Sequence, residues 1–293
     1  MEALLSLAFD NLASHAQEKH LKGLRQIDAL LAEVCLSSPA PKSTAEKRRS
    51  VIDPGKEPPP LKTLGELSSD PGFRAFFMMQ DSFEGNIAVR LIALLDKLLG
   101  QADSMENERL IMKTLELMQG VLLLHPQSRN LFSKDYIMNQ LFDLLEPSWC
   151  PATQTFTIAV LVAALLDSPQ NIRNFEENDG LLVITSALRS DTTRSVKMKL
   201  MEFIYFYLMP ETPALPSAKG TASGPSLLQR SPSKLARVAF GRGDTGGRKR
   251  ADSESLSTRT TEEKQMLLGK HMDKVEDLVA DLRDGTPFGG AVQ

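Results

Sequence analysis

The feature that most constrains the fold is a spacing that occurs three times, in which a proline is followed six residues later by a phenylalanine. A turn and an apolar helical stretch come next each time. The copies are Pro71…Phe77, Pro126…Phe132 and Pro169…Phe175. The last two begin 43 residues apart and agree best in sequence. A period of about 40 residues with several helices per unit is typical of armadillo or HEAT repeats. We therefore predict an all-α, armadillo/HEAT-like helical-repeat solenoid, which would offer an extended binding surface.

The composition argues against several classes of protein. With 293 residues, of which 42% are hydrophobic, the chain can form a sizeable core. Its formal charge of −3 gives no overall attraction to nucleic acid or to an anionic membrane. Cys35 and Cys150 make no disulfide framework, and no N-terminal signal sequence is evident. The longest uncharged apolar run, around 156–166, is shorter than the ~20 residues of a membrane span. We expect a soluble cytoplasmic protein without membrane insertion.

Residues 1–209 are predicted to form one armadillo-like helical domain. The segment 37–60 within it is rich in proline and poor in apolar residues, which is typical of a mobile loop. A first helix before this loop is indicated by the apolar stripe Leu24, Ile27, Leu31 and Val34. A helix of the body is marked by Phe83, Ile87, Leu91, Leu94 and Leu98. The run at 156–166 is apolar on all sides, and its length and alanines favour a buried helix over a β-strand.

The end of the body and the tail are separated by a change of composition. The last body helix carries Val196, Leu200, Phe203 and Tyr207, and Pro210 ends it because proline lacks a backbone donor. Residues 210–258 are rich in Pro, Gly, Ser and Arg and are predicted to be a disordered linker.

A C-terminal amphipathic helix is predicted over 259–285, followed by a flexible tail at 286–293. Thr260 and Glu263 form a capping-box pattern at its start. Isolated helices are marginal in water, so this helix should dock an apolar face on the solenoid or, as the alternative, on a partner. The predicted docking face comprises Leu268, Met272, Val275, Val279 and Leu282.

Signals for catalysis are poor. The histidines His15, His20, His125 and His271 fall in no metal-binding pattern, and His125 is interpreted as a helix-end residue before Pro126. No glycine-rich phosphate loop or nucleophile motif is present in the sequence. We therefore expect no catalytic, metal-binding or cofactor-binding residues, no small-molecule substrate and no enzyme activity.

The stretch 230–250 is locally basic and suggests a second set of functions. It contains one aromatic residue, Phe240, so a stacking platform for single-stranded nucleic acid is weakly supported. Nucleic acid is therefore a less favoured partner. The basic stretch is interpreted at least as well as a nuclear-import patch or as a run of solvated charges. Three serines in basic or proline-directed contexts are candidate phosphorylation sites, where a phosphate would add negative charge beside arginines. They are Ser50, Ser231 and Ser253.

Three blocks of sequence resemble the fungal septation initiation network cell-division-control family, which is distinct from the phosphatase that shares its label. The blocks are KGLRQIDALLAEVCLS (22–37), FRAFFMMQDSFEGNIAVRLIALLDKLL (73–99) and EKQMLLGKHMDKVEDLVADLRDGTPFG (263–289). The resemblance implies a non-catalytic partner of a sterile-twenty-class protein kinase that supports cytokinesis and septum formation at the spindle pole body. A generic armadillo-like adaptor for transport or cytoskeletal regulation is the alternative.

Candidate partner contacts combine charged or amide side chains with the most specific of these blocks. Each could instead have an ordinary role, as a solvated charge or, for Asn86, as a helix cap. The predicted partner-binding residues are Glu84, Asn86 and Arg90 in the body and Asp277, Asp281 and Arg283 in the tail helix.

Overall fold

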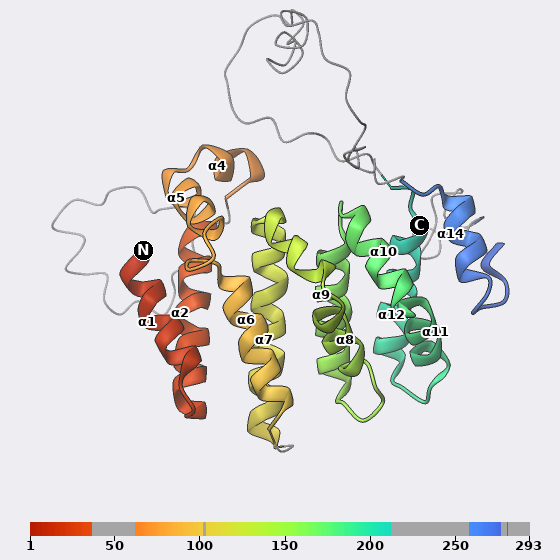
Figure 1. Ribbon diagram of the computed structural model, residues 1–293, viewed down its shortest axis with the longest axis horizontal. Coiled ribbons are helices and arrows are strands. Elements are labelled where there is room, and N and C mark those ends of the chain that lie inside the picture. Colours follow the sequence, from red (N-terminus) through yellow and green to blue (C-terminus); the bar gives the residue numbers. More distant parts are fainter. Residues whose placement is uncertain (37–61, 102–103, 212–257, 277–279, 281–293) are drawn as a thin grey trace, which may run out of the picture.

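A computed structural model describes residues 1–36, 62–101, 104–211 and 258–276, together with residue 280, and every element in these ranges is a helix (Figure 1). This confirms the prediction of an all-α fold. The predicted loop at 37–60, nearly all of the predicted linker at 210–258 and the tail at 286–293 lie outside the described residues. The elements are α1 (Glu2–Ala13), α2 (Gln17–Cys35), α4 (Leu64–Ser69), α5 (Pro71–Gln80), α6 (Ile87–Leu99), α7 (Met105–Leu124), the 3-10 helix η1 (Pro126–Ser133), α8 (Asp135–Asp143), α9 (Pro151–Leu165), α10 (Pro169–Glu177), α11 (Gly180–Arg189), α12 (Arg194–Leu208) and α14 (Thr261–Leu268).

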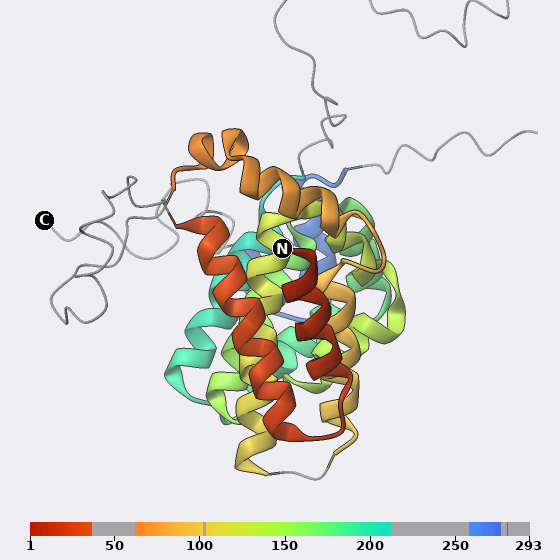
Figure 2. The same cartoon turned by 90° about the vertical axis from the view of Figure 1, so that its left-hand side faces the viewer.

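The helices follow one another along the long axis of the molecule in chain order (Figure 1). Helices α1 and α2 pack against each other at the N-terminal end, which Figure 2 turns toward the viewer. The long helices make a continuous series of contacts, α2 with α7, α7 with α9, and α9 with α12. Their shared core contains Leu115, Val121 and Leu161, all fully buried. Because each helix packs mainly on its neighbours, the molecule is an elongated row with a large surface.

Helix starts are set by side-chain caps that the sequence carries. The side chains of Asn86, Ser104 and Thr193 accept hydrogen bonds from the backbone amides of Val89, Asn107 and Val196, at the starts of α6, α7 and α12. The capping box predicted at Thr260 and Glu263 is also present at the start of α14.

Buried amide side chains join successive helical layers at a constant interval of sequence. Nδ2 of Asn86 donates to Ser128 Oγ (2.9 Å), Nδ2 of Asn171 to the carbonyl of Arg129 (2.8 Å), and Nδ2 of Asn174 to the carbonyl of Phe132 (3.0 Å). Each of these bonds spans 42 residues. Two further bonds span 44 residues, from Gln140 Nε2 to Asp96 Oδ1 and between His125 Nε2 and Asp81 Oδ1. The structure therefore has a period of 42–44 residues that begins near Asp81.

This period separates the first proline–phenylalanine copy from the other two. Pro126 and Pro169 open η1 and α10, and their partners Phe132 and Phe175 are fully buried. Pro71 instead opens α5, which precedes the periodic part, and there the fully buried phenylalanine is Phe76. The interval before Pro126 is longer because its three helices, α5, α6 and α7, have 10, 13 and 20 residues, whereas η1, α8 and α9 in the next interval have 8, 9 and 15.

His125 forms one of these connections through a buried ring. Its ring is 1% exposed and lies edge-on to Phe77, with the centroids 4.7 Å apart. Because the Asp81 carboxylate only accepts, Nε2 of the neutral ring carries the proton and donates to Asp81 Oδ1 (3.1 Å), and Nδ1 accepts from the Ser128 hydroxyl (2.8 Å). Burial lowers the pKa of His125 below its ordinary value, although Asp81 acts in the opposite direction.

Acidification should destabilise the protein through His125, because protonation of Nδ1 removes the acceptor for Ser128. Since the folded-state pKa is lower than the unfolded one, this contribution is complete above about pH 6.5 and is lost as the pH falls through the folded-state pKa. The free energy of unfolding in urea should therefore be lower at pH 5.5 than at pH 7.5. His125→Gln should reduce this difference. An equal pH dependence in the His125→Gln protein would contradict the assignment.

Candidate functional site

The turn at residues 81–86 joins α5 to α6 and is held by a buried glutamine. The side chain of Gln80 is 1% exposed; its Nε2 donates to the carbonyl of Gly85 (3.0 Å), and its Oε1 accepts from the backbone amide of Ile87 (2.8 Å). Asn86 Nδ2 donates to the carbonyl of Gln80 (2.7 Å) as well as to Ser128. With Asp81 bonded to His125, both ends of the turn are attached to the neighbouring layer.

Asn86, one of the predicted partner-binding residues, lies inside this network. It is 8% exposed, caps α6 and bonds to two other elements. Its effect on a partner would therefore act through the shape of the turn.

Of the other two predicted contacts in the body, Glu84 lies on the surface of the turn and Arg90 is half-buried at the start of α6. Glu84 is exposed, and the guanidinium of Arg90 approaches its backbone carbonyl (3.5 Å) instead of its carboxylate. The same guanidinium lies over the rings of Phe9 (5.3 Å) and Phe83 (5.9 Å). This places a cation between two aromatic rings contributed by α1 and by the turn.

Phe83 corrects an expectation from the sequence. It was assigned to the apolar stripe of a helix, but α6 begins only at Ile87, so Phe83 lies in the turn and is 72% exposed. Phe83 lies four residues before Ile87, so by chance it continues the helical spacing of α6 toward the N-terminus. Asn86, a preferred N-cap residue directly before an apolar run, is the signal that could have placed the helix start correctly.

An apolar hollow adjoins Phe83 on the surface of α6 and α8. It is lined by Phe83, Val89, Ile92, Leu131 and Tyr136 among others, and Tyr136 is 57% exposed. Exposed aromatic residues beside an arginine are the combination most enriched at the energetic centres of protein interfaces. We call Phe83, Glu84, Arg90 and Tyr136 the aromatic ridge.

The C-terminal segment differs from the prediction of one helix over 259–285. Helix α14 ends at Leu268, Gly269 caps it, and Lys274 has a left-handed backbone with φ of 62°. Glycine after an apolar helix is a frequent stop, because it lacks the side chain that favours continuation. In the predicted docking face, Leu268 and Val275 are 0% and 2% exposed, and Met272 packs on the core in part. Val279, Leu282, Asp277, Asp281 and Arg283 lie outside the described residues, as do Ser50, Ser231 and Ser253.

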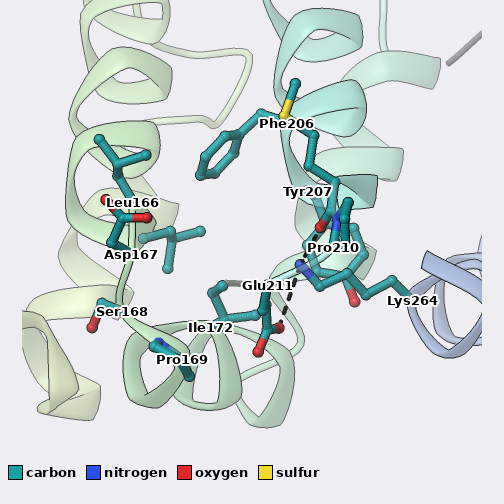
Figure 3. A pocket seen from close by; sticks show the side chains of 12 residues that line it. Leu166, Asp167, Ser168, Pro169, Ile172, Phe206, Tyr207, Pro210, Glu211 and Lys264 are labelled. Carbon is teal, nitrogen blue, oxygen red and sulfur yellow. Dashed lines mark hydrogen bonds and ion pairs between the residues drawn. The ribbon is translucent and has the colours of Figure 1, made fainter. Parts of the chain in front are cut away.

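Helix α14 contacts α12, and buried ion pairs connect this region to α10. Figure 3 shows Lys264 of α14 directed toward Glu211. Glu211 pairs with Arg173 (2.6 Å) and Lys264 (3.3 Å), while Glu176 pairs with Arg173 and Arg259 (both 2.6 Å). The Glu211 and Lys264 side chains are only 3% and 2% exposed. Three cations thus share two carboxylates in a partly dehydrated cluster.

Two neutral groups, the Met209 carbonyl and the Tyr207 side chain, complete the C-terminal cluster. Lys264 Nζ also donates to the carbonyl of Met209 (2.9 Å) and lies 5.2 Å from the centre of the Tyr207 ring. The Tyr207 hydroxyl donates to Glu176 (2.8 Å). Burial lowers the pKa of Lys264 and, together with Glu176, raises that of Tyr207.

A pocket of about 200 Å³ lies beside this cluster, between the ends of α9 and α12, the start of α10 and the C-terminal segment (Figure 3). Leu165, Ile172 and Phe206 make its wall largely apolar. Lys264 is directed to Glu211 and the Met209 carbonyl, so its amine is engaged in fastening the C-terminal segment.

A set of residues with the composition of a catalytic triad lies elsewhere, in Ser128, His125 and Asp81. Its order of exposure is the reverse of that in a hydrolase, because Ser128 is 2% exposed while the Asp81 side chain is 56% exposed. The Ser128 hydroxyl is also occupied by Asn86 and His125. These residues therefore hold the turn and present no accessible nucleophile.

In the part of the chain that the structure describes, no group of three or more His, Cys, Asp or Glu residues could hold a metal ion. Within the same residues, no helix has both the length and the apolar character needed to cross a membrane.

Comparison with known proteins gives two matches over most of the chain. The family model described as "Cell division control protein 14, SIN component" matches residues 1–288. The curated "Cell division control protein 14" of Schizosaccharomyces pombe (strain 972 / ATCC 24843) is 28% identical over 223 residues, which cover 73% of this chain and 78% of that protein. No solved structure matches the chain.

The ion cluster predicts that substitutions of two buried residues, Glu211 and Lys264, destabilise the docked C-terminal segment to different extents. Glu211→Gln leaves three cations around one carboxylate and should destabilise the docked C-terminal segment by about 3 kcal/mol. Lys264→Met leaves two carboxylates and two guanidiniums, so its effect should be smaller. Hydrogen exchange of the α14 amides measures both, and equal exchange in the two variants would contradict the charge balance.

Proposed function

The chain belongs to the Cell division control protein 14, SIN component, family, and on that premise we propose that it is a non-catalytic scaffold and regulatory partner of a sterile-twenty-class protein kinase. SIN denotes the septation initiation network, the kinase network that triggers cytokinesis and septum formation. In this proposal the protein supports the activity or recruitment of that kinase in the cytoplasm at the spindle pole body.

A helical-repeat solenoid of the armadillo type is the proposed architecture for this task. The 42–44-residue interval of the buried hydrogen bonds supports it, as does the order of short helices followed by the long helices α7, α9 and α12. Such a row provides an extended surface for a kinase lobe or an extended segment of a partner.

The aromatic ridge is the proposed contact surface, and its rigidity is the observation that carries the proposal. Phe83 is 72% exposed on a turn whose two ends are bonded to buried residues. An exposed aromatic side chain that is already ordered loses little conformational entropy on binding. Glu84, the next residue in the chain, and Arg90, which lies over the Phe83 ring, supply charges near Phe83, which suits recognition of a partner with both apolar and charged groups.

The proposal also includes residues of the C-terminal tail that lie outside the described part of the chain. Asp277, Asp281 and Arg283 stay predicted contacts, and phosphorylation of Ser231 is proposed to tune partner binding through added negative charge. Ser50 and Ser253 are proposed as further modification sites. Phosphopeptide mapping across the cell cycle tests all three serines.

Phe83→Ala should weaken kinase binding by at least about tenfold, because truncating an aromatic residue at the centre of an interface commonly has this effect. The experiment captures sterile-twenty-class kinases from dividing cells with the full chain and measures affinity with the captured kinase. Arg90→Ala should also weaken binding. Met198→Ala, at a residue that is 53% exposed on α12, is the matched control and should bind normally.

The stability of the variants separates binding from folding. Since Phe83 is exposed, its substitution should change the free energy of unfolding by less than about 0.5 kcal/mol. Normal kinase binding by Phe83→Ala would remove the ridge from the interface. Failure of the unaltered chain to capture any kinase of this class would refute the proposed partner itself.

A further inference from the structure

A second concave surface lies where α6 ends, α7 begins and α8 ends. Its wall includes Glu108 near the start of α7, Asp143 at the end of α8, and Glu146 and Trp149 in the turn before α9. Met105 and Asn107 line the same surface. We call these six residues the acidic pocket: Met105, Asn107, Glu108, Asp143, Glu146 and Trp149. It is separate from both the aromatic ridge and the C-terminal cluster.

The carboxylates of the acidic pocket are not neutralised by the protein. Among the described residues, no lysine, arginine or histidine forms an ion pair with Glu108, Asp143 or Glu146. Glu108 accepts one hydrogen bond, from the backbone amide of Cys150 (3.1 Å). Burial and the neighbouring charge of Glu146 raise the pKa of Asp143. A cation entering the pocket would relieve this repulsion.

Asn107 provides an independent indication of a missing donor. It lines the same pocket and is 2% exposed. Its Nδ2 donates to the carbonyl of Leu98 (3.0 Å), while its Oδ1 is buried and has no hydrogen-bond partner among the described residues. Buried acceptors without a partner are rare, because they lose their bonds to water without replacement. The wall of the pocket therefore holds one acceptor without a donor, beside carboxylates without a cation.

The remaining walls favour a cation with an apolar or planar body. Trp149 is half-buried, and Met105 is 76% exposed at the rim. An indole ring attracts cations over its face and stacks with planar groups. The carboxylates do not converge closely enough, within the described residues, to form a metal-binding group. A larger cation with several N–H donors can contact carboxylates that lie too far apart to share one divalent ion.

We propose that the acidic pocket binds an arginine side chain of a partner protein. The planar guanidinium offers donors in several directions, so it can reach two carboxylates while its face lies against an aromatic ring. Oδ1 of Asn107, which is buried in the wall, would become a further acceptor for this guanidinium if the side chain turned toward the pocket. This inference is independent of the kinase partner and of the aromatic ridge.

Trp149 is the only tryptophan of the chain, so its fluorescence reports on this pocket directly. The full-length protein is titrated with an acetylated, amidated Gly-Arg-Gly-Arg-Gly peptide, and matched peptides carry Lys or Glu in place of Arg. Calcium chloride forms a fourth titration. The expected result is a saturable change with the arginine peptide, weaker with lysine, absent with glutamate and calcium, and reduced by added salt.

Two substitutions and one control locate the binding. Asp143→Asn and Glu146→Gln should each weaken the arginine peptide about twofold to fivefold, the range expected for one exposed charge pair. Glu177→Gln makes the same charge change at an exposed residue outside the acidic pocket and should leave binding unchanged. Equal losses in all three variants would show that only the net charge matters and would overturn the assignment.

Other occupants of the acidic pocket, namely calcium, a lysine side chain or a segment of the same chain, would give different results in these titrations. A response to calcium alone, or equal affinity for the lysine peptide, would overturn the choice of a guanidinium. If replacing Arg248, Lys249 and Arg250 with Ala alters the Trp149 spectrum without peptide, the site belongs to the chain's own basic segment, which would overturn the assignment to a partner. Absence of any spectral change with the arginine peptide would overturn the site itself, even where kinase capture is normal.

Discussion

Buried polar side chains must find partners inside the protein, and in this molecule they find them one helical layer away. Asn86, Asn171 and Asn174 each donate to a group 42 residues distant, and His125 and Asp81 are joined across 44. Apolar contacts between α7, α9 and α12 tolerate small shifts of one helix against another. Buried amides tolerate such shifts less, because a broken hydrogen bond leaves their polar atoms without a partner. These bonds therefore fix how each layer sits on the next, and the positions of the surface turns follow from them.

The two ends of the row use this constraint in different ways. At the N-terminal end, neutral amides and an imidazole hold the turn at 81–86, which leaves Phe83 and Glu84 on the surface. At the C-terminal end, Glu211 and Lys264 attach a segment that is distant in sequence through buried charges. The acidic pocket differs from both, because within the described residues its carboxylates form no ion pair and Oδ1 of Asn107 has no hydrogen-bond partner. That contrast distinguishes a surface that supports the fold from one that is available to a ligand.

The sequence predicted the helical class and the period from Pro126 and Pro169, because local spacing determines both. It assigned Phe83 to a helix since the apolar spacing continues past the helix start, although Asn86 carried the capping signal. It extended the C-terminal helix past Gly269 for a similar reason. The pairing of Glu211 with Arg173 and Lys264 could not be predicted, because it joins residues that only the tertiary fold brings together. The unpartnered Asn107 carbonyl is likewise a property of packing.

The most direct test of the account replaces Asn86 with Ala, which removes the bonds to Gln80 and Ser128 without altering the exposed Phe83. Hydrogen exchange and capture of the kinase are measured on the same preparation. The account predicts faster exchange at residues 81–90, unchanged exchange in α12, and weaker kinase binding because the ridge is no longer held in place. Normal kinase binding with a freely exchanging turn would contradict it, as would a turn that stays fully protected without Asn86.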